Sequence, residues 1–515
     1  MNMSRSRMIA YGLPGLATLF TFTMFTTYGL YFFTDVVGLS ASFAGMILTI
    51  GTFWDAITDP LIGIISDNRD PQKGRRRPFL LFSAIPFGII TWLLFTCWNL
   101  VELHQKIYFI IVALLFYTVQ TTTDVPYTSL SGEVTDDYNT RSQLAMIRTF
   151  WAIVGVAIGG GVMAYTSYLV PIVGGKRQAW SVCFGIFGVI CTISILIGWY
   201  ASKGYENKNA IVKNKISIKS IFNGPFKNKP FLHLTGAFIF GILAQVIFLG
   251  ILVYYLSNNL ELSEGQISAV NIIMWIVALF WVFPIDMWST KISKAKAWVI
   301  SMGIWLSCMI VFPLFFLKKG SSIGPIIMSS ILVVGLNALY QVIYSMISDC
   351  VEVDELITGE RKEGLYYSLA TVSQKIAAAI GTSILGISID KIGYNTLLDV
   401  QSQSTLQGFN FIFIVGTSIC LILSILCMVT NPLTKARYYD VLQALKIKKS
   451  GGLIKITDFN DLLILKKDIK WLKFRELLKS NSLFHTLFCD YLFSHLLNVF
   501  LLFGNHQHVQ TYMKH

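Results

Sequence analysis

Charged side chains are scarce in this chain of 515 residues. Asp, Glu, Lys and Arg together make up 13% of the sequence, whereas 54% of the residues are hydrophobic. This balance excludes an ordinary soluble domain. The formal net charge of +13 could indicate nucleic-acid binding. However, Lys and Arg occur in short clusters between apolar runs, so we expect no nucleic acid among the partners.

Cysteines with the paired spacing of a metal site are also lacking. Most of the eight cysteines lie within apolar runs, as Cys183, Cys191 and Cys308 do, and are typical of small core residues. The apolar runs contain no constellation of a nucleophile and a base, nor of metal ligands. We therefore expect neither an enzyme nor a cofactor.

Apolar segments long enough to cross a bilayer recur through most of the chain. The first follows Arg5 and Arg7 and extends to Phe33, which is too long for a signal peptide. Because a spanning helix needs about 20 residues, the sequence predicts an all-α integral membrane protein with twelve transmembrane helices. These are predicted at about 9–33, 41–66, 79–99, 107–131, 143–169, 179–200, 231–257, 265–288, 297–317, 324–348, 365–390 and 409–430.

Basic residues gather in alternate loops. The loops after spans two, six and eight hold Lys and Arg clusters at 69–77, 203–229 and 291–296, whereas the other loops hold few. Cytoplasmic loops are enriched in Lys and Arg, so this pattern predicts that both termini are cytoplasmic. We expect a multi-pass protein of the plasma membrane, or of the cytoplasmic membrane if the source is bacterial.

The longest polar loop between spans, at 201–230, divides the twelve into six and six. An echo supports two related halves, because residues 127–134 close span four and the similar residues 344–352 close span ten. Two related bundles place a substrate near the membrane midplane between them. We predict bundles at 1–200 and 231–435, a cytoplasmic middle loop at 201–230, and a cytoplasmic or membrane-surface tail at 436–515.

Two stretches of the tail have a pattern of their own. Residues 462–479 form a basic, roughly amphipathic segment that could lie on the inner leaflet. Residues 483–504 are apolar but include His485, Asp490 and His495. A surface tail is therefore favoured there over a thirteenth span.

Two carboxylates within span two are the main functional signal. Asp55 and Asp59 are four residues apart, so they lie on one helix face, where like charges repel. Carboxylates inside a membrane are costly, so a cation between the two or protonation of one is expected. Thr58 and Thr121 could supply further oxygens to Na⁺ or Li⁺, whereas H⁺ needs only one carboxylate. The structural alternative is a pair solvated at a helix end.

Three further charges accompany this pair within the spans. Asp124 precedes Pro126 in span four, where the proline frees backbone carbonyl groups. Arg148 lies in span five and Lys375 in span eleven, and each must face a cavity or an acidic partner. A purely structural ion pair is the alternative for each charge. Because Lys375 belongs to the second half, a bridge to the acids could form and break as a cavity moves.

Several motifs occur around these residues: FTDVVGL at 33–39, WDAITDP at 54–60, GRRRP at 74–78, DVPY at 124–127 and GERKEG at 359–364. With Arg141, Arg148 and Lys375, they resemble the glycoside–pentoside–hexuronide:cation symporter family of the major facilitator superfamily, typified by the melibiose permease. The resemblance covers about residues 9–435. It implies two six-helix bundles and cation-coupled symport of a sugar or glycoside by alternating access. We expect a functional monomer whose partners are that small molecule, Na⁺ or H⁺, and the lipid bilayer.

The resemblance also assigns roles to single residues. It implies a cation site at Asp55, Asp59 and Thr121, which Asp124 links to the substrate pocket. Arg148 and Lys375 match family positions near the sugar. The residues assigned to conformational gating on the cytoplasmic side are Gly63, Asp67, Arg75, Arg76, Arg77, Arg141 and Arg361.

Three positions depart from the melibiose permease. Its sugar-holding aspartate on span one is Leu19 here, its sugar-stacking tryptophan is Thr128, and the tyrosine before the cation threonine is Gln120. Gln120 and Thr128 are still expected near the substrate. The departures argue against galactoside recognition, while the cation residues are kept. The alternatives are a hexuronide or other non-galactoside solute, or a non-transporting membrane sensor with the same fold.

Overall fold

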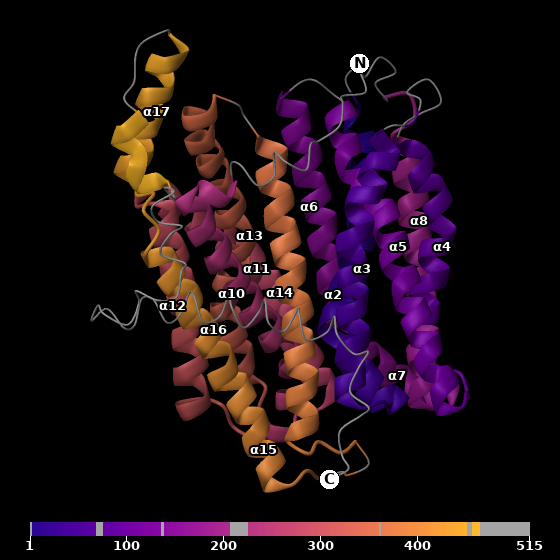
Figure 1. Cartoon of the computed structure of the whole chain (residues 1–515). Helices are drawn as coiled ribbons and strands as arrows, with labels where there is room; N and C mark the ends of the chain where they lie inside the picture. Colours follow the sequence, from indigo (N-terminus) through magenta and orange to yellow (C-terminus); the bar gives the residue numbers. More distant parts are fainter. Residues whose placement is uncertain are drawn as a thin grey trace, which may run out of the picture.

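The computed structural model describes residues 3–67, 69, 76–134, 138–205, 225–359, 362–396, 398, 400–450 and 456–463. Within these residues the chain is a bundle of helices, with a single isolated β-bridge between Asn228 and Leu463 (Figure 1). Eleven of the described helical segments are long and apolar enough to cross a membrane, and there are twelve if one bent pair is counted as a span.

The first group of helices lies on one side of the bundle (Figure 1). Its helix α2 continues without a break into a π-helical turn, η1, and positive-φ Gly38 then lets the chain reverse toward α3. The helices are α1 (Arg5–Gly12), α2 (Pro14–Tyr31), η1 (Phe32–Val37), α3 (Ala41–Asp67), α4 (Arg77–Leu94), α5 (Glu102–Val134), α6 (Tyr138–Gly160), α7 (Val162–Val173) and α8 (Lys176–Ala201).

The second group lies on the other side. Asn228 caps the start of α10, and Ser263 and Gln266 form a capping box at the start of α11. The helices are η3 (Pro225–Lys227), α10 (Lys229–Tyr254), η4 (Tyr255–Asn259), α11 (Glu264–Lys291), α12 (Lys294–Phe315), α13 (Ile323–Thr358), α14 (Glu363–Lys391), α15 (Gln403–Asn410), η5 (Phe411–Gly416), α16 (Thr417–Val429), α17 (Lys435–Lys449) and η6 (Ile456–Leu462).

The predicted fifth span, 143–169, is a bent pair rather than one straight helix. α6 ends at Gly160 and α7 begins at Val162, with a bend of 47° between them. Glycine has no side chain to hold the helix against its neighbours, and three glycines occur in a row at 159–161. The bend therefore falls at the weakest point of the span.

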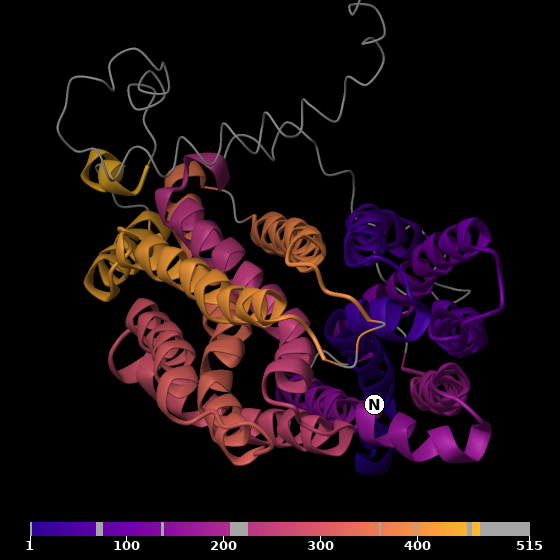
Figure 2. The same cartoon turned by 90° about the horizontal axis from the view of Figure 1, so that it is seen from below.

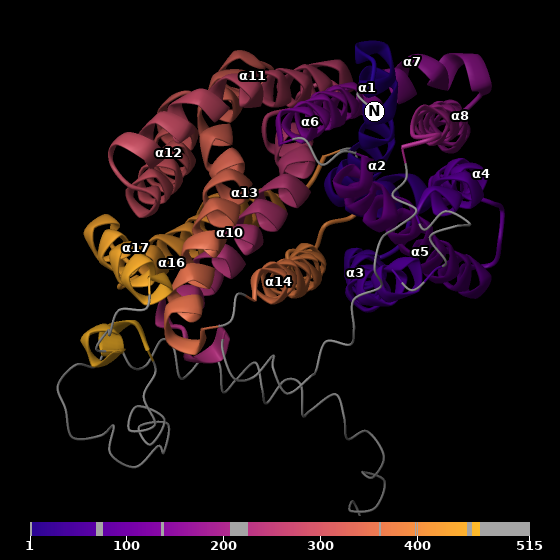
Figure 3. The same ribbon diagram turned by 90° about the horizontal axis from the view of Figure 1, so that it is seen from above.

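The two groups meet along α3 and α14, and along α6 and α11 (Figures 2 and 3). Small residues allow the backbones to approach closely, as is usual between membrane helices. A Cβ added to Gly45 would lie 2.8 Å from the carbonyl oxygen of Thr382. A Cβ added to Gly386 would lie 2.4 Å from the carbonyl oxygen of Ala41. These two glycines are therefore required for α3 and α14 to pack as they do.

Helix α13 extends ten residues beyond its predicted end at 348, because its last turns pack against α17. Val353 and Leu356 form a small apolar cluster with Val441, Leu445 and Phe459. The start of the tail is thus a helix fastened to the second group, at the same end of the molecule as Arg5 (Figure 1). Residues 464–515, which include the 483–504 segment and nearly all of the predicted amphipathic segment, lie outside the described residues.

Candidate transport site

The two aspartates of α3 share one lysine from α14. Lys375 Nζ lies 2.6 Å from Asp55 Oδ2, and it also donates to Asp59 Oδ2. Asp55 is buried, with 7% of its surface exposed, whereas the side chain of Asp59 is 28% exposed. An ammonium group between two carboxylates removes the repulsion that their i, i+4 spacing would otherwise cause. The first and second groups of helices are thereby bridged at the centre of the bundle.

The predicted threonines lie against the same carboxylates. Thr121 Oγ1, on α5, donates to Asp55 Oδ1 at 2.7 Å. Thr58 Oγ1 lies 3.3 Å from Thr121 Oγ1, and both residues are buried. Carboxylate and hydroxyl oxygens from two adjacent helices are the ligands that hard cations prefer. The four residues can therefore offer a small cation several oxygens in one place.

A hydrogen-bonded polar group joins α5 to α2 beside this site. Gln120 Nε2 donates to the carbonyl oxygen of Thr18 at 2.9 Å, and Thr21 Oγ1 donates to Gln120 Oε1 at 3.1 Å. Asp124, one turn further along α5, is hydrogen-bonded to the side chain of Thr18. Both polar ends of Gln120 are thus occupied within the first group.

Arg148 approaches this group from α6. Its guanidinium lies 6.0 Å from the ring of Tyr127 and interacts electrostatically with Asp124. The backbone of α6 lies so close to α2 that a Cβ on Gly15 would be 2.7 Å from the carbonyl oxygen of Arg148. Thr128 lies on α5, one turn beyond Asp124, and is exposed.

The residues assigned to gating are only partly within the described structure. Arg76 Nη1 donates to the carbonyl oxygen of Ser129 at 2.5 Å. Arg77 Nε donates to the carbonyl oxygen of Trp199 at 2.9 Å. The guanidinium of Arg77 also lies over the indole ring of Trp199, 4.6 Å from the ring centroid. The start of α4 is thereby tied to α5 and α8. Gly63 and Asp67 lie in the last turns of α3 and Arg141 near the start of α6, whereas Arg75 and Arg361 lie outside the described residues.

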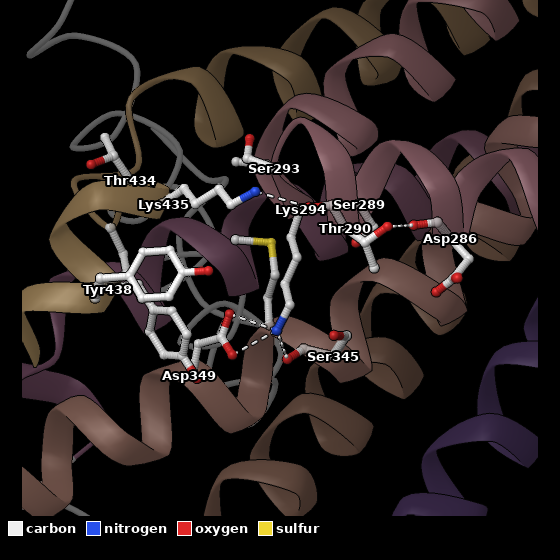
Figure 4. A pocket seen from close by; sticks show the side chains of 14 residues that line it. Asp286, Ser289, Thr290, Ser293, Lys294, Ser345, Asp349, Thr434, Lys435 and Tyr438 are labelled. Carbon is white, nitrogen blue, oxygen red and sulfur yellow. Dashed lines mark hydrogen bonds and ion pairs between the residues drawn. The ribbon is translucent and has the colours of Figure 1, made fainter. Parts of the chain in front are cut away.

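In the second group, an ion pair occurs just after α11, at the start of α12. Lys294 Nζ lies 2.7 and 2.8 Å from the two carboxylate oxygens of Asp349 and donates to the carbonyl oxygen of Ser345. These side chains border a cavity of about 370 Å³ between α11, α12, α13 and α17 (Figure 4). The cavity is lined by residues of the second group alone, at the end of the bundle where α17 packs.

Contacts between the two groups gather toward the opposite end of the bundle, away from Arg5. The Asp390 carboxylate accepts from the backbone N–H groups of Ala41 and Ser42 at 2.8 and 2.7 Å, so α14 caps the start of α3. Tyr394 donates to Asp35 at 2.5 Å. Further polar contacts of this kind include Thr34 with Tyr254, Thr49 with Ser383, Ala164 with Ser268, and Lys176 with Glu264.

Several polar residues of the second group were not named from the sequence. Tyr340 OH donates to Gln245 Oε1 at 2.9 Å, and Tyr344 OH donates to Gln374 Oε1 at 3.3 Å. Being uncharged, they do not stand out within an apolar span as an aspartate does. Their signal is the spacing of polar residues along α13.

Comparison with known proteins gives the family. The model of a family described as MFS/sugar transport protein matches residues 10–435. The chain belongs to this family. It is the glycoside–pentoside–hexuronide:cation symporter family that the motifs indicated, and the protein is a cation-coupled, multi-pass membrane symporter rather than an enzyme.

Three relatives illustrate the breadth of the match. An uncharacterized symporter of Synechocystis sp., sll1374, is 24% identical over 543 residues, covering 87% of this chain and 97% of its own. The inner membrane symporter YicJ of Escherichia coli is 24% identical and covers 82% of this chain and 90% of its own. The isoprimeverose transporter of Lactiplantibacillus pentosus is 24% identical and covers 79% of this chain and 85% of its own.

Solved structures show the same fold at low sequence identity. A bacterial homolog of the human lysosomal transporter Spinster, in an inward-facing and occupied conformation, has a TM-score of 0.58 and 13% identity over 85% of this chain and 97% of its own. The nucleoside transporter NupG has a TM-score of 0.57 and 11% identity over 84% of this chain and all of its own. The symporter therefore has the major facilitator fold.

Proposed function

We propose that this symporter moves a neutral sugar or glycoside together with Na⁺ or H⁺, and that Asp55, Asp59, Thr58 and Thr121 bind the cation. The observation that carries the proposal is the position of Lys375 between the two aspartates. Its ammonium lies where a coupling cation would find the most oxygens. The lysine and the cation would therefore compete for the same carboxylates.

This competition gives a mechanism for coupling. A cation that binds Asp55 and Asp59 releases Lys375, which is then free to turn toward the substrate and toward Asp124. Substrate affinity rises when the cation is bound, and by linkage the substrate raises cation affinity by the same factor. Without a cation, Lys375 returns to the aspartates and offsets one of their two negative charges, so the empty carrier can reorient without leaving both carboxylates unpaired.

The direction of opening follows from the contacts between the groups. They gather at the end away from Arg5, where Asp390 caps α3 and Tyr394 binds Asp35. With both termini cytoplasmic, as the basic loops predict, this end is extracellular, and the structure represents a state closed to the outside. Release of those contacts would open the site outward, while the charged residues after α3 and α11 would close the cytoplasmic end.

The charges at the site favour a neutral substrate over a hexuronide. If all five groups are ionised, the carboxylates of Asp55, Asp59 and Asp124 outnumber the cations of Arg148 and Lys375 by one. Both cations already face carboxylates. An anionic sugar would have to displace them from these partners, whereas a neutral glycoside would not. The isoprimeverose transporter among the relatives is consistent with a neutral glycoside.

Uptake of a panel of sugars into proteoliposomes tests the proposal. The panel includes isoprimeverose, other neutral glycosides and hexuronides, each with an imposed Na⁺ or H⁺ gradient. We expect a gradient of one ion to stimulate uptake of a neutral glycoside at least tenfold. Asp59→Cys should fold normally and abolish that stimulation. The matched variant Asp440→Cys, on the exposed face of α17, should retain it.

Three results would contradict all or part of the proposal. Unchanged stimulation in Asp59→Cys would remove this carboxylate from the cation site. Binding of a glycoside without any net flux, under either gradient, would favour the membrane sensor over the symporter. Uptake of hexuronides alone would reject the neutral substrate and retain the cation site.

A further inference from the structure

Helix α13 carries a polar face that the ion site does not use. Between Leu332 and Cys350 every residue of α13 is buried except six, and all six are polar. Their spacing alternates between three residues and one, which places them on a single face of the helix. The six residues are Asn337, Tyr340, Gln341, Tyr344, Ser345 and Ser348. We call them the polar face of α13.

The polar face points into the protein rather than toward lipid. Asn337 and Gln341 donate to the carbonyl oxygens of Ala278 and Val282 on α11, at 2.5 and 3.1 Å. Tyr340 and Tyr344 donate to side chains on α10 and α14. α13 lies among these helices (Figure 3).

Residues elsewhere in the second group show what lipid exposure looks like. On α16 the exposed side chains include Ile419, Ile422 and Leu426, with exposed fractions of 51%, 44% and 51%. These exposed positions of α16 are thus apolar, as the cost of unpaired polar groups in lipid requires. The partly exposed amides, phenols and hydroxyls of the polar face of α13 therefore indicate a face that is in contact with water.

The chemistry of the polar face suits hydroxyl groups. Its side chains are uncharged, and its amide and hydroxyl groups both donate and accept hydrogen bonds. Gln341 Oε1 is buried and accepts no hydrogen bond from the residues that the structure describes. A buried acceptor without a donor is costly, so a ligand hydroxyl would satisfy it. A fully charged ligand would find no countercharge on this face.

The polar face also adjoins the ion site. Tyr344 OH donates to Gln374, and Gln374 directly precedes Lys375 on α14. Gln374 and Lys375 are thus neighbours on one helix. The amide of Gln374 contacts α13, and the ammonium of Lys375 contacts α3. At its other end the polar face reaches the cavity between α11, α12, α13 and α17, where Ser345 contributes to the lining (Figure 4).

We propose that Gln341, Tyr344 and Gln374 form the substrate-binding wall of the second group of helices and select for the hydroxyl pattern of a neutral sugar. This proposal rests on the proposed function. Gln341 accepts from one sugar hydroxyl through its free Oε1. Tyr344 and Gln374 exchange their mutual hydrogen bond for bonds to a second hydroxyl. They act as specificity-determining residues, while the aspartates of α3 hold the cation.

The first test measures whether water reaches the polar face of α13, and it needs no substrate. Gln341→Cys and Ser345→Cys are exposed in nanodiscs to a permanently charged methanethiosulfonate, and peptide mass spectrometry assigns the labelled cysteine. Such a reagent reacts only with thiols that water reaches. We expect both variants to be labelled at least tenfold faster than Val342→Cys and Ile343→Cys, which are buried on the same turns. Ile419→Cys, exposed toward lipid, should also remain slow.

The labelling result decides the first half of the proposal. Equal, slow labelling of Gln341→Cys, Ser345→Cys and the buried controls would show a dry face and overturn it. Labelling of Ile419→Cys as fast as Gln341→Cys would overturn it as well, because exposure alone would then explain the reaction. Neither outcome depends on cation coupling, so the proposed function would stand or fall separately.

The second test asks whether the wall binds sugar. With the neutral glycoside that gives the largest uptake in the panel, Tyr344→Phe and Gln374→Leu should each raise KM at least fivefold. The factor by which the ion gradient stimulates uptake should stay the same, since the cation residues are intact. The control is Gln105→Leu. It removes an amide near the start of α5, which is the end of that helix away from the site, and it should leave KM unchanged.

Two patterns of kinetics are distinguishable from a failure of the symport proposal. An unchanged KM in both Tyr344→Phe and Gln374→Leu would overturn the wall while leaving the symporter in place. Loss of gradient stimulation in these two variants, with KM unchanged, would also overturn it, because the residues would then act on the cation. Absence of uptake for every sugar in the wild-type protein is the failure of the proposed function.

Discussion

The two groups of helices bring different chemistry to the proposed transport site. The first group supplies carboxylates, with Asp55 and Asp59 on α3 and Asp124 on α5. The second supplies uncharged amides and phenols on α10, α13 and α14, and one cation, Lys375. Gln120 of the first group is buried with both polar ends hydrogen-bonded inside that group, whereas Gln341 Oε1 of the second accepts no hydrogen bond from the described part of the chain.

This division separates two tasks within one site. A coupling cation needs concentrated negative charge, which Asp55 and Asp59 of the first group would supply under the proposed function. A sugar needs donors and acceptors without strong charge, which the polar face of α13 would offer under our proposal. Among the residues that the structure describes, Lys375 is the side chain of the second group that contacts the carboxylates of Asp55 and Asp59. It is therefore the residue through which occupation of one half of the site can be sensed by the other.

Removal of Lys375 should break this connection and produce the largest effect. Lys375→Val leaves Asp55 and Asp59 facing one another without the shared ammonium, and breaking a buried ion pair costs about 3–5 kcal/mol. We expect concentrative uptake to fall at least tenfold in proteoliposomes with an imposed ion gradient. Lys319→Val, at an exposed lysine between α12 and α13, is the matched control. A Lys375→Val protein that still concentrates substrate would limit this lysine to a structural role.

The packing of α14 against α3, where the two groups meet, can be disrupted by adding a side chain at Gly386. Gly386→Val places its Cβ within 2.4 Å of the carbonyl oxygen of Ala41, so α14 can no longer lie against α3 at the closed end. We expect uptake to fall about three- to tenfold, and a cysteine introduced at Ser383, beside Thr49, to become accessible to a charged thiol reagent. The measurement compares both quantities with Gly303→Val on α12.

Gly303 is a fair control because an added Cβ there would meet no atom within 4 Å. Both substitutions put valine into a helix, so their intrinsic cost to the helix is the same. If both variants lose uptake equally, or neither does, the close approach of α14 to α3 does not matter for transport. A selective loss in Gly386→Val assigns the effect to the contact between the groups.

The carboxylates could be found from the sequence because each charge is an anomaly within an apolar span. The same reasoning indicated a bridge from Lys375 to the acids, and the structure places Lys375 between Asp55 and Asp59. The helical membrane fold was also accessible, since the length of the apolar spans follows directly from the thickness of a bilayer.

Features that depend on packing could not be predicted. Tyr344 and Gln341 are neutral residues whose exposure is decided by how α10, α11 and α14 surround α13. The bend at Gly161 arises because three glycines leave α6 and α7 without side chains there, yet glycine is common in straight membrane helices. Helix α17 is stabilised by Val441 and Leu445 against the extension of α13, a contact between residues about 90 positions apart.

The smallest effect is expected for the ion pair that holds α17 in place, because this pair is exposed, whereas the pair at Lys375 is largely buried. Arg437 lies 2.6 Å from Asp461 Oδ1, and this hydrogen bond lowers the pKa of Asp461 below its ordinary value of 3.8. A lowered pKa stabilises the folded state above pH 4, and that contribution is lost as the pH falls through the lowered value. Because half of the Asp461 side chain is exposed, solvent screening limits the contribution to about 0.5 kcal/mol.

Hydrogen exchange of α17 in the intact protein measures this contribution. Asp461→Asn should raise the exchange of α17 amides about twofold at pH 6, relative to helices elsewhere in the second group. High salt should produce a similar change in the wild-type protein, since an exposed pair is screened by ions. The bridge at Lys375 should respond to neither, because its partners are buried or half-buried. A tenfold or greater loss of protection in Asp461→Asn would show that the exposed pair carries far more than its exposure predicts.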